Sequence, residues 1–392
     1  MERSSALLGL MLLGTSLGCS RSREPVTDAG SGDAGANELC DRTFETVEVS
    51  GGAMRLDTEL PSVGVALQRV LPMDDGGVLV LVFVADGPGG FRVLARFDAE
   101  GRLAWRTEVS RSDVAFSATA DVARTPSGWR VQGIDRGEIE LTLWQADVDD
   151  AGSIVREDAV LVPDERGDGS ALTGLALLPT SVEPDAYLLR AGRLVVRTRG
   201  EETALEVSFG GPTRLSGTRS SSGATTCLVA RDLTTGAIEL VRLTGRVEVS
   251  ERVEIVSAGA SYNPQPIARE GACELAYFEP DVVRPSRGRM RIWGRDASIV
   301  GWAGTTPIGH ALQSDGSLVL AAANPEWPDR YDVWWIRPAD GECATPEPQL
   351  VLPLGPRGTP LGALLAAETP SGARLVLGGL TAPDEVRIAT PR

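Results

Sequence analysis

The sequence feature that most restricts the fold is a turn followed by an apolar strand, which recurs along nearly the whole chain. Its best copy lies in residues 73–109, where the turns 74–77 and 98–101 join three expected strands. Asp-Gly and Gly-Gly pairs take the positive φ angles that hairpin turns need. Residues 78–84 are all apolar, so both faces of that strand must be buried, whereas residues 91–97 alternate between two faces.

Six further copies of the turn follow this unit, each leading into an apolar strand. They occupy residues 126–129, 183–186, 221–224, 269–272, 314–317 and 370–373. Gly76 and Gly372 lie 296 residues apart over six intervals, which gives a mean spacing of about 49 residues. Repeats of about 40–50 residues with about four strands each are typical of a β-propeller.

We therefore expect an all-β fold, a seven-bladed β-propeller of four-stranded antiparallel blades. The expected blades span approximately residues 57–110, 113–162, 170–209, 212–256, 262–303, 306–353 and 358–390. The last range lacks a fourth strand, which we expect residues 43–50 to supply from before the first blade. Pairing of residues 44–49 with 386–389 would close the ring and cover an otherwise open sheet edge.

The first blade carries a longer pattern, D-G-G, an apolar strand, and then F/L-D-x-x-G-x-x-x-W. The matching residues are Asp75, Gly76, Gly77, Phe97, Asp98, Gly101 and Trp105. This pattern resembles the degenerate repeats of secreted bacterial propellers, lipoproteins among them. The resemblance implies the architecture and no particular activity, because propellers have many unrelated functions. The chain lacks the W-D dipeptides of WD40 repeats and the S-x-D-x-G-x-T-W box of sialidases.

The N-terminal residues 1–18 have the pattern of a secretory signal peptide. Arg3 precedes an apolar stretch, residues 6–13, that is too short for a permanent membrane helix of about 20 residues. Residues 15–19 resemble the lipobox of bacterial lipoproteins, although Ser16 replaces the usual leucine. The resemblance implies that Cys19 is the lipidation site, carrying palmitate or a similar chain. An ordinary signal peptide with an incidental cysteine is the alternative.

The segment that follows is expected to be a tether. Residues 19–39 are mostly small and polar, so they cannot bury enough apolar surface to fold. We expect residues 40–392 to form the propeller. In the lipoprotein family, Ser20 after the lipidated cysteine favours the outer membrane of a Gram-negative bacterium over the inner membrane. The side of that membrane is left open.

Composition excludes several classes of function. The net charge of −16 argues against nucleic acid and anionic lipid headgroups as partners, so contact with a membrane is expected through the lipid anchor only. All 38 basic residues are arginine, which excludes catalysis that depends on lysine. His310 is the only histidine, so no multi-histidine metal site is possible, and a packed or solvated role is expected for it. No catalytic, cofactor or metal site is predicted.

Four cysteines remain if Cys19 carries lipid, and an exported chain with an even number favours disulfides. Three pairings are possible. We favour Cys40–Cys343 together with Cys227–Cys273. The second bridge requires neighbouring sheets to converge, because packed sheets lie about 10 Å apart and a disulfide needs Cα atoms within about 7 Å. Two buried thiols are the alternative for that pair.

Two kinds of candidate site remain. Residues 147–152 resemble the start of a calcium loop, but Ala151 occupies a ligand position, which favours a polar turn.

The longest loops between second and third strands are expected at residues 279–289 and 324–331. Arginine and tryptophan are enriched at binding hot spots. The candidate partner-binding residues in these loops are Arg284, Arg287, Arg289, Trp327 and Arg330.

These features favour a lipoprotein of the cell envelope, a non-catalytic and monomeric propeller scaffold that binds a protein or glycan partner. The alternative is a propeller glycosidase or lyase that uses paired carboxylates. Two carboxyl groups about 5–10 Å apart in a pocket would favour the enzyme.

Overall fold

The structure is a computed structural model of the chain. It describes residues 47–55, 65–86, 89–112, 119–136, 140–163, 172–211, 213–258, 264, 266–281, 283, 287–294, 299–305, 307, 309–312, 317–323, 330–336, 349–356, 363–369, 372–378 and 385–391. The chain divides into two units, Met1–Asp41 and Arg42–Arg392, and all described residues belong to the second. Within these ranges no helix is long and apolar enough to cross a membrane.

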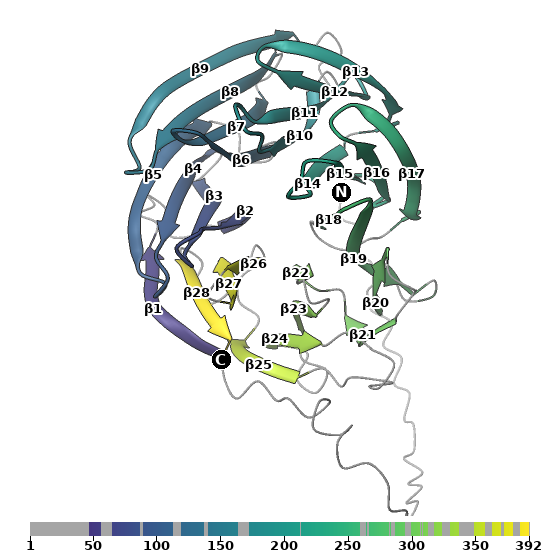
Figure 1. Ribbon diagram of the computed structural model, residues 1–392. Helices are drawn as coiled ribbons and strands as arrows, with labels where there is room; N and C mark the ends of the chain where they lie inside the picture. Colours follow the sequence, from purple (N-terminus) through teal and green to yellow (C-terminus); the bar gives the residue numbers. More distant parts are fainter. Residues whose placement is uncertain are drawn as a thin grey trace, which may run out of the picture. The chain divides into compact units, whose positions relative to one another are not determined.

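The described residues form 28 strands in seven four-stranded antiparallel sheets (Figure 1). Sheet β2–β5 contains β2 (Val65–Pro72), β3 (Val78–Asp86), β4 (Gly89–Phe97) and β5 (Leu103–Ser112). Sheet β6–β9 contains β6 (Thr119–Thr125), β7 (Gly128–Arg136), β8 (Glu140–Asp149) and β9 (Ile154–Pro163). Sheet β10–β13 contains β10 (Leu172–Leu178), β11 (Asp185–Arg190), β12 (Arg193–Thr198) and β13 (Glu201–Ser208). Sheet β14–β17 contains β14 (Thr213–Arg219), β15 (Thr225–Asp232), β16 (Ile238–Thr244) and β17 (Glu248–Val256).

The remaining sheets come from the last part of the chain. Sheet β18–β21 contains β18 (Pro266–Arg269), β19 (Ala272–Pro280), β20 (Arg287–Trp293) and β21 (Ile299–Thr305). Sheet β22–β25 contains β22 (Gly309–Leu312), β23 (Leu318–Ala323), β24 (Arg330–Ile336) and β25 (Gln349–Pro356). The final sheet contains β26 (Ala363–Thr369), β27 (Gly372–Gly378), β28 (Glu385–Pro391) and β1 (Val47–Arg55).

The strand β1 pairs with β28, so the two ends of the folded unit share one sheet. Val49 lies opposite Ala389, and Met54 lies opposite Val386, with a bulge between them. The strand extends beyond the expected residues 43–50, to Arg55, while residues 43–46 lie outside the described residues. The glycines at 51 and 52 sit in the bulge, which lets the strand continue instead of turning.

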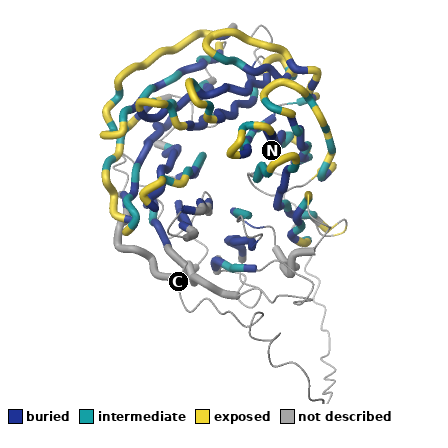
Figure 2. The backbone as a smooth tube through the Cα atoms, in the orientation of Figure 1, coloured by how far each residue is buried: buried dark blue, intermediate teal, exposed yellow. Residues whose placement is uncertain are grey.

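Neighbouring sheets meet mainly through their first strands. The strand β2 contacts β6 and β26, β10 contacts β6 and β14, and β14 contacts β18. The strand β22 contacts the first strand β26 on one side and the second strand β19 on the other. Figure 1 shows these first strands on the inside and β5, β9, β13 and β17 on the outside. Buried backbone lies inward and exposed backbone lies along the outer strands (Figure 2). The prediction of an all-β propeller with four-stranded antiparallel blades is confirmed.

The two faces of β3 pack into different cores. Val78, Val80, Val82 and Val84 belong to a cluster shared with β26, β27 and β28. Leu79 and Leu81 belong to another, shared with β7 and β8 of the next sheet. Each side chain of this kind contributes roughly 1.5–3 kcal/mol when fully buried. The continuous apolar run is therefore explained, since the sheet has a neighbour on either face.

The aspartates of the repeated turns cap backbone groups of those turns. Gly76 has a φ of 85°, and the Asp75 carboxylate accepts a hydrogen bond from the Gly77 N–H at 3.0 Å. Asp98 accepts from the Arg102 N–H at 2.8 Å. Glycine is favoured at such φ angles because an L side chain is strained there. The turn chemistry follows from backbone geometry, as the sequence indicates.

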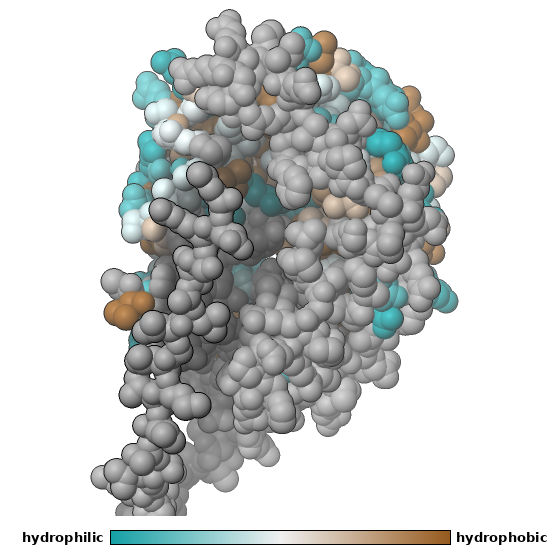
Figure 3. Space-filling view, turned by 180° about the vertical axis from the view of Figure 1, so that it is seen from behind, coloured by the Kyte–Doolittle hydropathy of each residue, from teal (hydrophilic) through white to brown (hydrophobic). Residues whose placement is uncertain are grey.

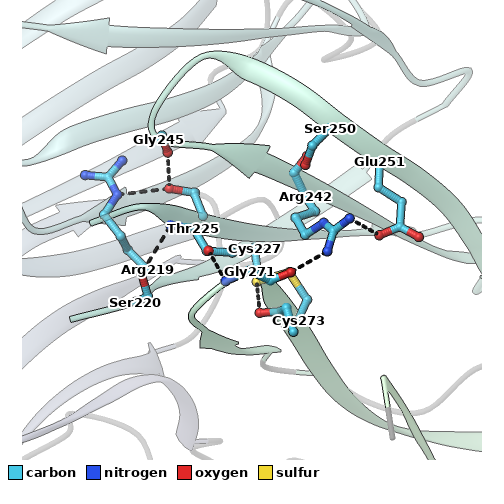
Figure 4. Close-up of a disulfide and its surroundings, with 12 residues drawn as sticks. Arg219, Ser220, Thr225, Cys227, Arg242, Gly245, Ser250, Glu251, Gly271 and Cys273 are labelled. Carbon is cyan, nitrogen blue, oxygen red and sulfur yellow. Dashed lines mark hydrogen bonds and ion pairs between the residues drawn. A yellow bond between two sulfur atoms is a disulfide. The ribbon is translucent and has the colours of Figure 1, made fainter. Parts of the chain in front are cut away.

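The bridge between Cys227 and Cys273 is present (Figure 4). It joins β15 to β19 of the next sheet, with Cα atoms 5.9 Å apart. The expected local convergence is visible beside it, because the Thr225 hydroxyl accepts a hydrogen bond from the Gly271 N–H at 2.7 Å. Cys19, Cys40 and Cys343 lie outside the described residues, so the other pairing stays a prediction.

Candidate functional site

Two open pockets lie at one edge of the sheets, which we call the turn face. At this edge the first strand of a sheet turns into the second, and the third turns into the fourth. The Trp129 pocket has a volume of about 490 Å³ and lies between sheets β2–β5 and β6–β9. The Arg246 pocket has a volume of about 760 Å³ and lies between sheets β10–β13 and β14–β17.

The Trp129 pocket is lined by ion pairs and apolar groups. Its walls include Arg69, Leu71, Pro72, Met73, Asp74, Asp75, Arg96, Val122, Ala123, Arg124, Trp129, Asp150, Leu177 and Pro179. Arg96 pairs with Asp75 at 2.6 Å, and Arg124 pairs with Asp150. The Arg124 guanidinium also lies 4.6 Å from the centroid of the Trp129 ring, a cation–π distance. The pocket therefore offers paired charges beside an aromatic ring.

Both carboxylates of these pairs favour the ionised form. The hydrogen bond from Arg124 lowers the pKa of Asp150 below its ordinary value, against the opposing effect of burial. The pKa of Asp75 is lowered mainly by the backbone N–H of Gly77, with a further contribution from Arg96. A general acid needs a raised pKa, so neither group is prepared to donate a proton at neutral pH.

The Arg246 pocket is rich in arginine and hydroxyl groups. Its walls are Pro179, Thr180, Ser181, Val182, Glu183, Thr198, Arg199, Arg219, Ser220, Ser221, Ser222, Gly223 and Arg246. They come from the loop between β10 and β11 and from the turns that follow β12, β14 and β16. Three arginines stand against one carboxylate, Glu183, on these walls.

A buried carboxylate fixes two of these arginines. Asp185, whose side chain is fully buried, lies 2.9 Å from Arg219 and accepts a hydrogen bond of 2.8 Å from Arg246 Nε. Arg246 Nη2 also binds the same carboxylate. The Thr198 hydroxyl donates to Asp185 at 2.7 Å, and the Tyr187 hydroxyl accepts from Arg219 at 2.8 Å. Burial raises the pKa of Tyr187, so its hydroxyl stays protonated.

A second buried carboxylate lies where four sheets meet. Arg69 of β2 pairs with Asp121 of β6 at 3.4 Å and donates to the Gly217 carbonyl of β14 at 3.0 Å. Asp121 also accepts from the Leu177 N–H of β10 at 2.9 Å. Burial raises the pKa of the Asp121 carboxyl, and Arg69 opposes this effect. These contacts tie the first strands together, which is a structural role.

His310 is a packed core residue, as expected. It lies in β22, 3% exposed, and its Nε2 is 2.9 Å from the Ala276 carbonyl of β19 in the neighbouring sheet. Burial lowers its pKa to about 4. A general base for neutral pH needs a higher pKa and access to substrate, and His310 has neither.

The calcium-like segment is a polar turn whose carboxylates have other partners. Asp147 pairs with Arg130 at 2.8 Å, and Asp149 accepts from the backbone N–H groups of Ala151 and Ser153 at 3.0 and 2.7 Å. Asp150 pairs with Arg124. Among the residues with a described position, no group of three or more His, Cys, Asp or Glu could hold a metal ion.

The predicted partner-binding residues belong to the edge opposite the turn face, where second strands lead into third strands. Arg289 is exposed in β20, opposite Glu279 of β19. Arg287 begins β20 and Arg330 begins β24, but their side chains lie outside the described residues. Arg284 and Trp327 lie outside them entirely. Their role stays a prediction.

On the face seen from behind, the described residues include hydrophilic groups with hydrophobic groups scattered among them (Figure 3). Exposed Val155, Val160 and Leu161 all belong to β9, the outer strand of its sheet. Single exposed apolar residues of this kind are normal on soluble proteins. The turn-face pockets, which loop length did not indicate, are therefore the clearest candidate sites.

Comparison with known proteins gives similarity of fold only. No protein-family model matches the chain, and no curated protein matches it. Hydrazine synthase of Kuenenia stuttgartiensis is 13% identical, with a TM-score of 0.46 over 87% of this chain and 98% of that one. Aleuria aurantia lectin in complex with alpha-methyl-L-fucoside is 14% identical, with a TM-score of 0.43 over 77% and 97%. The WD40 domain of SCAP from fission yeast is 9% identical, with a TM-score of 0.41 over 88% and 98%.

Proposed function

We propose that this chain is a non-catalytic propeller scaffold that binds a protein or glycan partner at the cell envelope. The observation that carries the proposal is the pair of open pockets on the turn face. Their walls combine paired charges, hydroxyl groups and the Trp129 ring. Pockets that place a few polar groups among apolar ones are typical of sites that orient a ligand.

The electrostatics of the Trp129 pocket favour binding over glycoside hydrolysis. Glycosidases use two carboxyl groups, one of which has a raised pKa and protonates the leaving group. Asp75 and Asp150 both have a lowered pKa, and each is held by an arginine. Held, ionised carboxylates accept hydrogen bonds from ligand hydroxyl or amide groups, which is a recognition role.

The proposal includes export and anchoring through a lipid on Cys19, followed by residues 20–39 as a tether. The signal-like segment and the lipobox resemblance of residues 15–19 support it. It also takes the seven sheets as blades of one closed ring, and the pairing of β1 with β28 supports this. A second bridge, Cys40–Cys343, belongs to the same proposal.

Anchoring is tested by labelling with a radioactive or clickable palmitate analogue in a Gram-negative host. The unaltered chain should incorporate the label and sediment with outer-membrane vesicles. Cys19→Ser should lose both properties, while Cys40→Ser should lose neither. Labelling that survives in Cys19→Ser would refute the anchor at that residue.

Binding is tested with a glycan array and with cross-linking in envelope extracts. Arg124→Ala removes a charge of the Trp129 pocket, Arg289→Ala removes one at the opposite edge, and Arg156→Ala is an exposed control on outer strand β9. We expect Arg124→Ala alone to weaken capture. Weakening by Arg289→Ala alone would move the site to the predicted loops. An unaltered chain that captures neither glycans nor a specific protein would refute the proposed function.

A further inference from the structure

We propose that the Arg246 pocket binds an anionic group, a carboxylate or a sulfate ester, on a hydroxyl-rich ligand such as an acidic saccharide. This inference rests on the proposed binding function and names the ligand chemistry of one of its pockets. Four features of the pocket support it: the charge of its lining, the fixed position of Arg246, the placement of Arg199 by a hairpin turn, and the hydroxyl groups of the walls.

The charge of the pocket lining is opposite in sign to that of the chain, whose net charge is −16. Arg199, Arg219 and Arg246 line the pocket, and buried Asp185 balances one of the three. Glu183 on the wall lies 3.5 Å from Arg130, but Arg130 also pairs with Asp147, so Glu183 counts against the three arginines. After Asp185 and Glu183 are subtracted, one net positive charge remains, and Arg199 and Arg246 are the exposed arginines that can meet a ligand.

Arg246 is held in place with one end directed away from Asp185. Its Nε and Nη2 both bind Asp185, and the Tyr187 hydroxyl donates to its backbone carbonyl at 2.8 Å. Its Nη1 makes no hydrogen bond within the described part of the chain, and its side chain is 46% exposed. A guanidinium fixed on one side in this way loses little further freedom when its other side binds an oxyanion.

Arg199 occupies a backbone conformation that favours glycine. Its φ is 50°, in the left-handed region, and Gly200 beside it has a φ of 88°, with no atom within 4 Å of the position a Cβ would take. Arg199 is exposed and has no ion pair with any residue whose side chain the structure describes. Two-residue hairpin turns need a positive φ at both positions, and Ala191–Gly192 in the same sheet has the same conformation, so the turn between β12 and β13 fixes the backbone of Arg199. The turn thereby places the Arg199 guanidinium on the pocket wall.

Hydroxyl groups complete the walls. Thr180, Ser181, Thr198, Ser220, Ser221 and Ser222 all line the pocket. The Ser222 hydroxyl donates to Glu270 of the next sheet at 2.6 Å, so Glu270 places one negative charge beside the rim. Saccharides match such walls because their hydroxyls both donate and accept. Thr180, Thr198, Ser220 and Ser222 already bond to protein groups, so among the described residues Ser181 and Ser221 are the hydroxyls left for a saccharide beside the arginines.

The test uses the full chain and titrates three probes: a heparin-derived oligosaccharide, an oligogalacturonate and a neutral dextran oligosaccharide. Sulfate carries the charge of the first probe and carboxylate that of the second, so the two arms distinguish the anionic groups. We expect at least one acidic probe to bind, and dextran to bind no more than weakly. Added salt should weaken the binding of the acidic probe, since exposed charge contacts are screened.

Variants locate the contact. Arg199→Gln and Arg246→Gln should each weaken the binding of the acidic probe roughly tenfold, because each removes a charged hydrogen bond. Glu270→Gln should strengthen the binding of that probe, since a nearby negative charge is lost. Arg190→Gln, an exposed arginine paired with Glu202, is the matched control and should change nothing. Arg199→Gln keeps the test valid if Arg246→Gln unfolds, because Arg199 has no ion-pair partner among the described residues whose loss could unfold the chain.

The outcomes separate this inference from the proposed function. Equal binding of dextran and acidic probes, or acidic binding that Arg199→Gln leaves unchanged, would overturn the anionic site. In that case capture of a protein or a neutral glycan would still support the binding scaffold. Failure of every probe, together with failure to capture any partner, would overturn both.

Discussion

Acid should destabilise this protein through His310 well before most carboxylates titrate. In the folded state burial lowers the pKa of His310 from 6.5 to about 4. Its Nε2 faces the Ala276 carbonyl and therefore carries the proton, so Nδ1 must take up the second one. Nδ1 has no hydrogen-bond partner in the described structure. Protonation would thus create a buried cation that no described residue neutralises, which is costly.

The sign and size follow from linkage. Because the folded pKa is the lower one, the unfolded chain binds the proton first, and stability falls as the pH drops from 6.5 towards 4. A shift of this size corresponds to about 3 kcal/mol in all, of which roughly 2 kcal/mol should be lost between pH 7 and pH 5. With an m-value of about 3 kcal/mol/M, the urea midpoint should fall by roughly 0.7 M.

The assay is urea denaturation of the unaltered chain and of His310→Gln at pH 7 and pH 5. Glutamine can still donate to the Ala276 carbonyl but does not titrate in this range. Burial raises the pKa of Asp121, which opposes the effect by adding stability as the pH falls, but it acts equally in both chains. The difference between the two chains therefore isolates His310, the only histidine. An equal fall of the urea midpoint from pH 7 to pH 5 in both chains would refute the reasoning.

Two further changes test the fold. Replacing Cys227 and Cys273 together by alanine opens a bridge between residues 46 positions apart and should lower the free energy of unfolding by about 4 kcal/mol, which urea denaturation with and without reductant would measure. A reductant that leaves the unaltered chain's midpoint in place would contradict this. Gly152→Ala places a Cβ 2.7 Å from Trp105 and should cost about 1–3 kcal/mol more than Gly200→Ala, which has a similar φ and open space. Equal thermal midpoints for the two variants would count against the steric argument.

The fold class was predictable because turn chemistry and apolar runs are local signals. Val78 to Asp86 forms β3 where the all-apolar run begins, and Gly76 has the expected positive φ. The extent of β1 was less predictable, since its two glycines form a bulge instead of a turn. Pairing across a bulge depends on the partner strand, and the sequence of one strand does not contain that information.

The candidate site was harder to predict because its parts are distant in sequence. Loop length pointed to Arg289 and the edge at which second strands lead into third strands, whereas the described pockets lie at the turn face. Asp185 stands in a stretch that looks like an ordinary turn, but it binds Arg246, 61 residues later. The one local signal was Arg199 followed by Gly200, an arginine beside a turn glycine, and many arginines have such neighbours.

Arginine content alone could not locate a binding site, because buried arginines join neighbouring sheets in this fold. The joined pairs are Arg69 with Asp121, Arg92 with Asp135, and Arg219 with Asp185. Arg92 is fully buried and lies 5.0 Å from the Trp144 ring, so its charge serves packing. Removing one partner of a buried pair costs about 3–5 kcal/mol, since the other charge stays desolvated. Only arginines whose guanidinium group is exposed on one side remain available for a ligand. Asp185 joins the two roles, because the carboxylate that holds Arg219 between sheets also orients Arg246 towards the pocket.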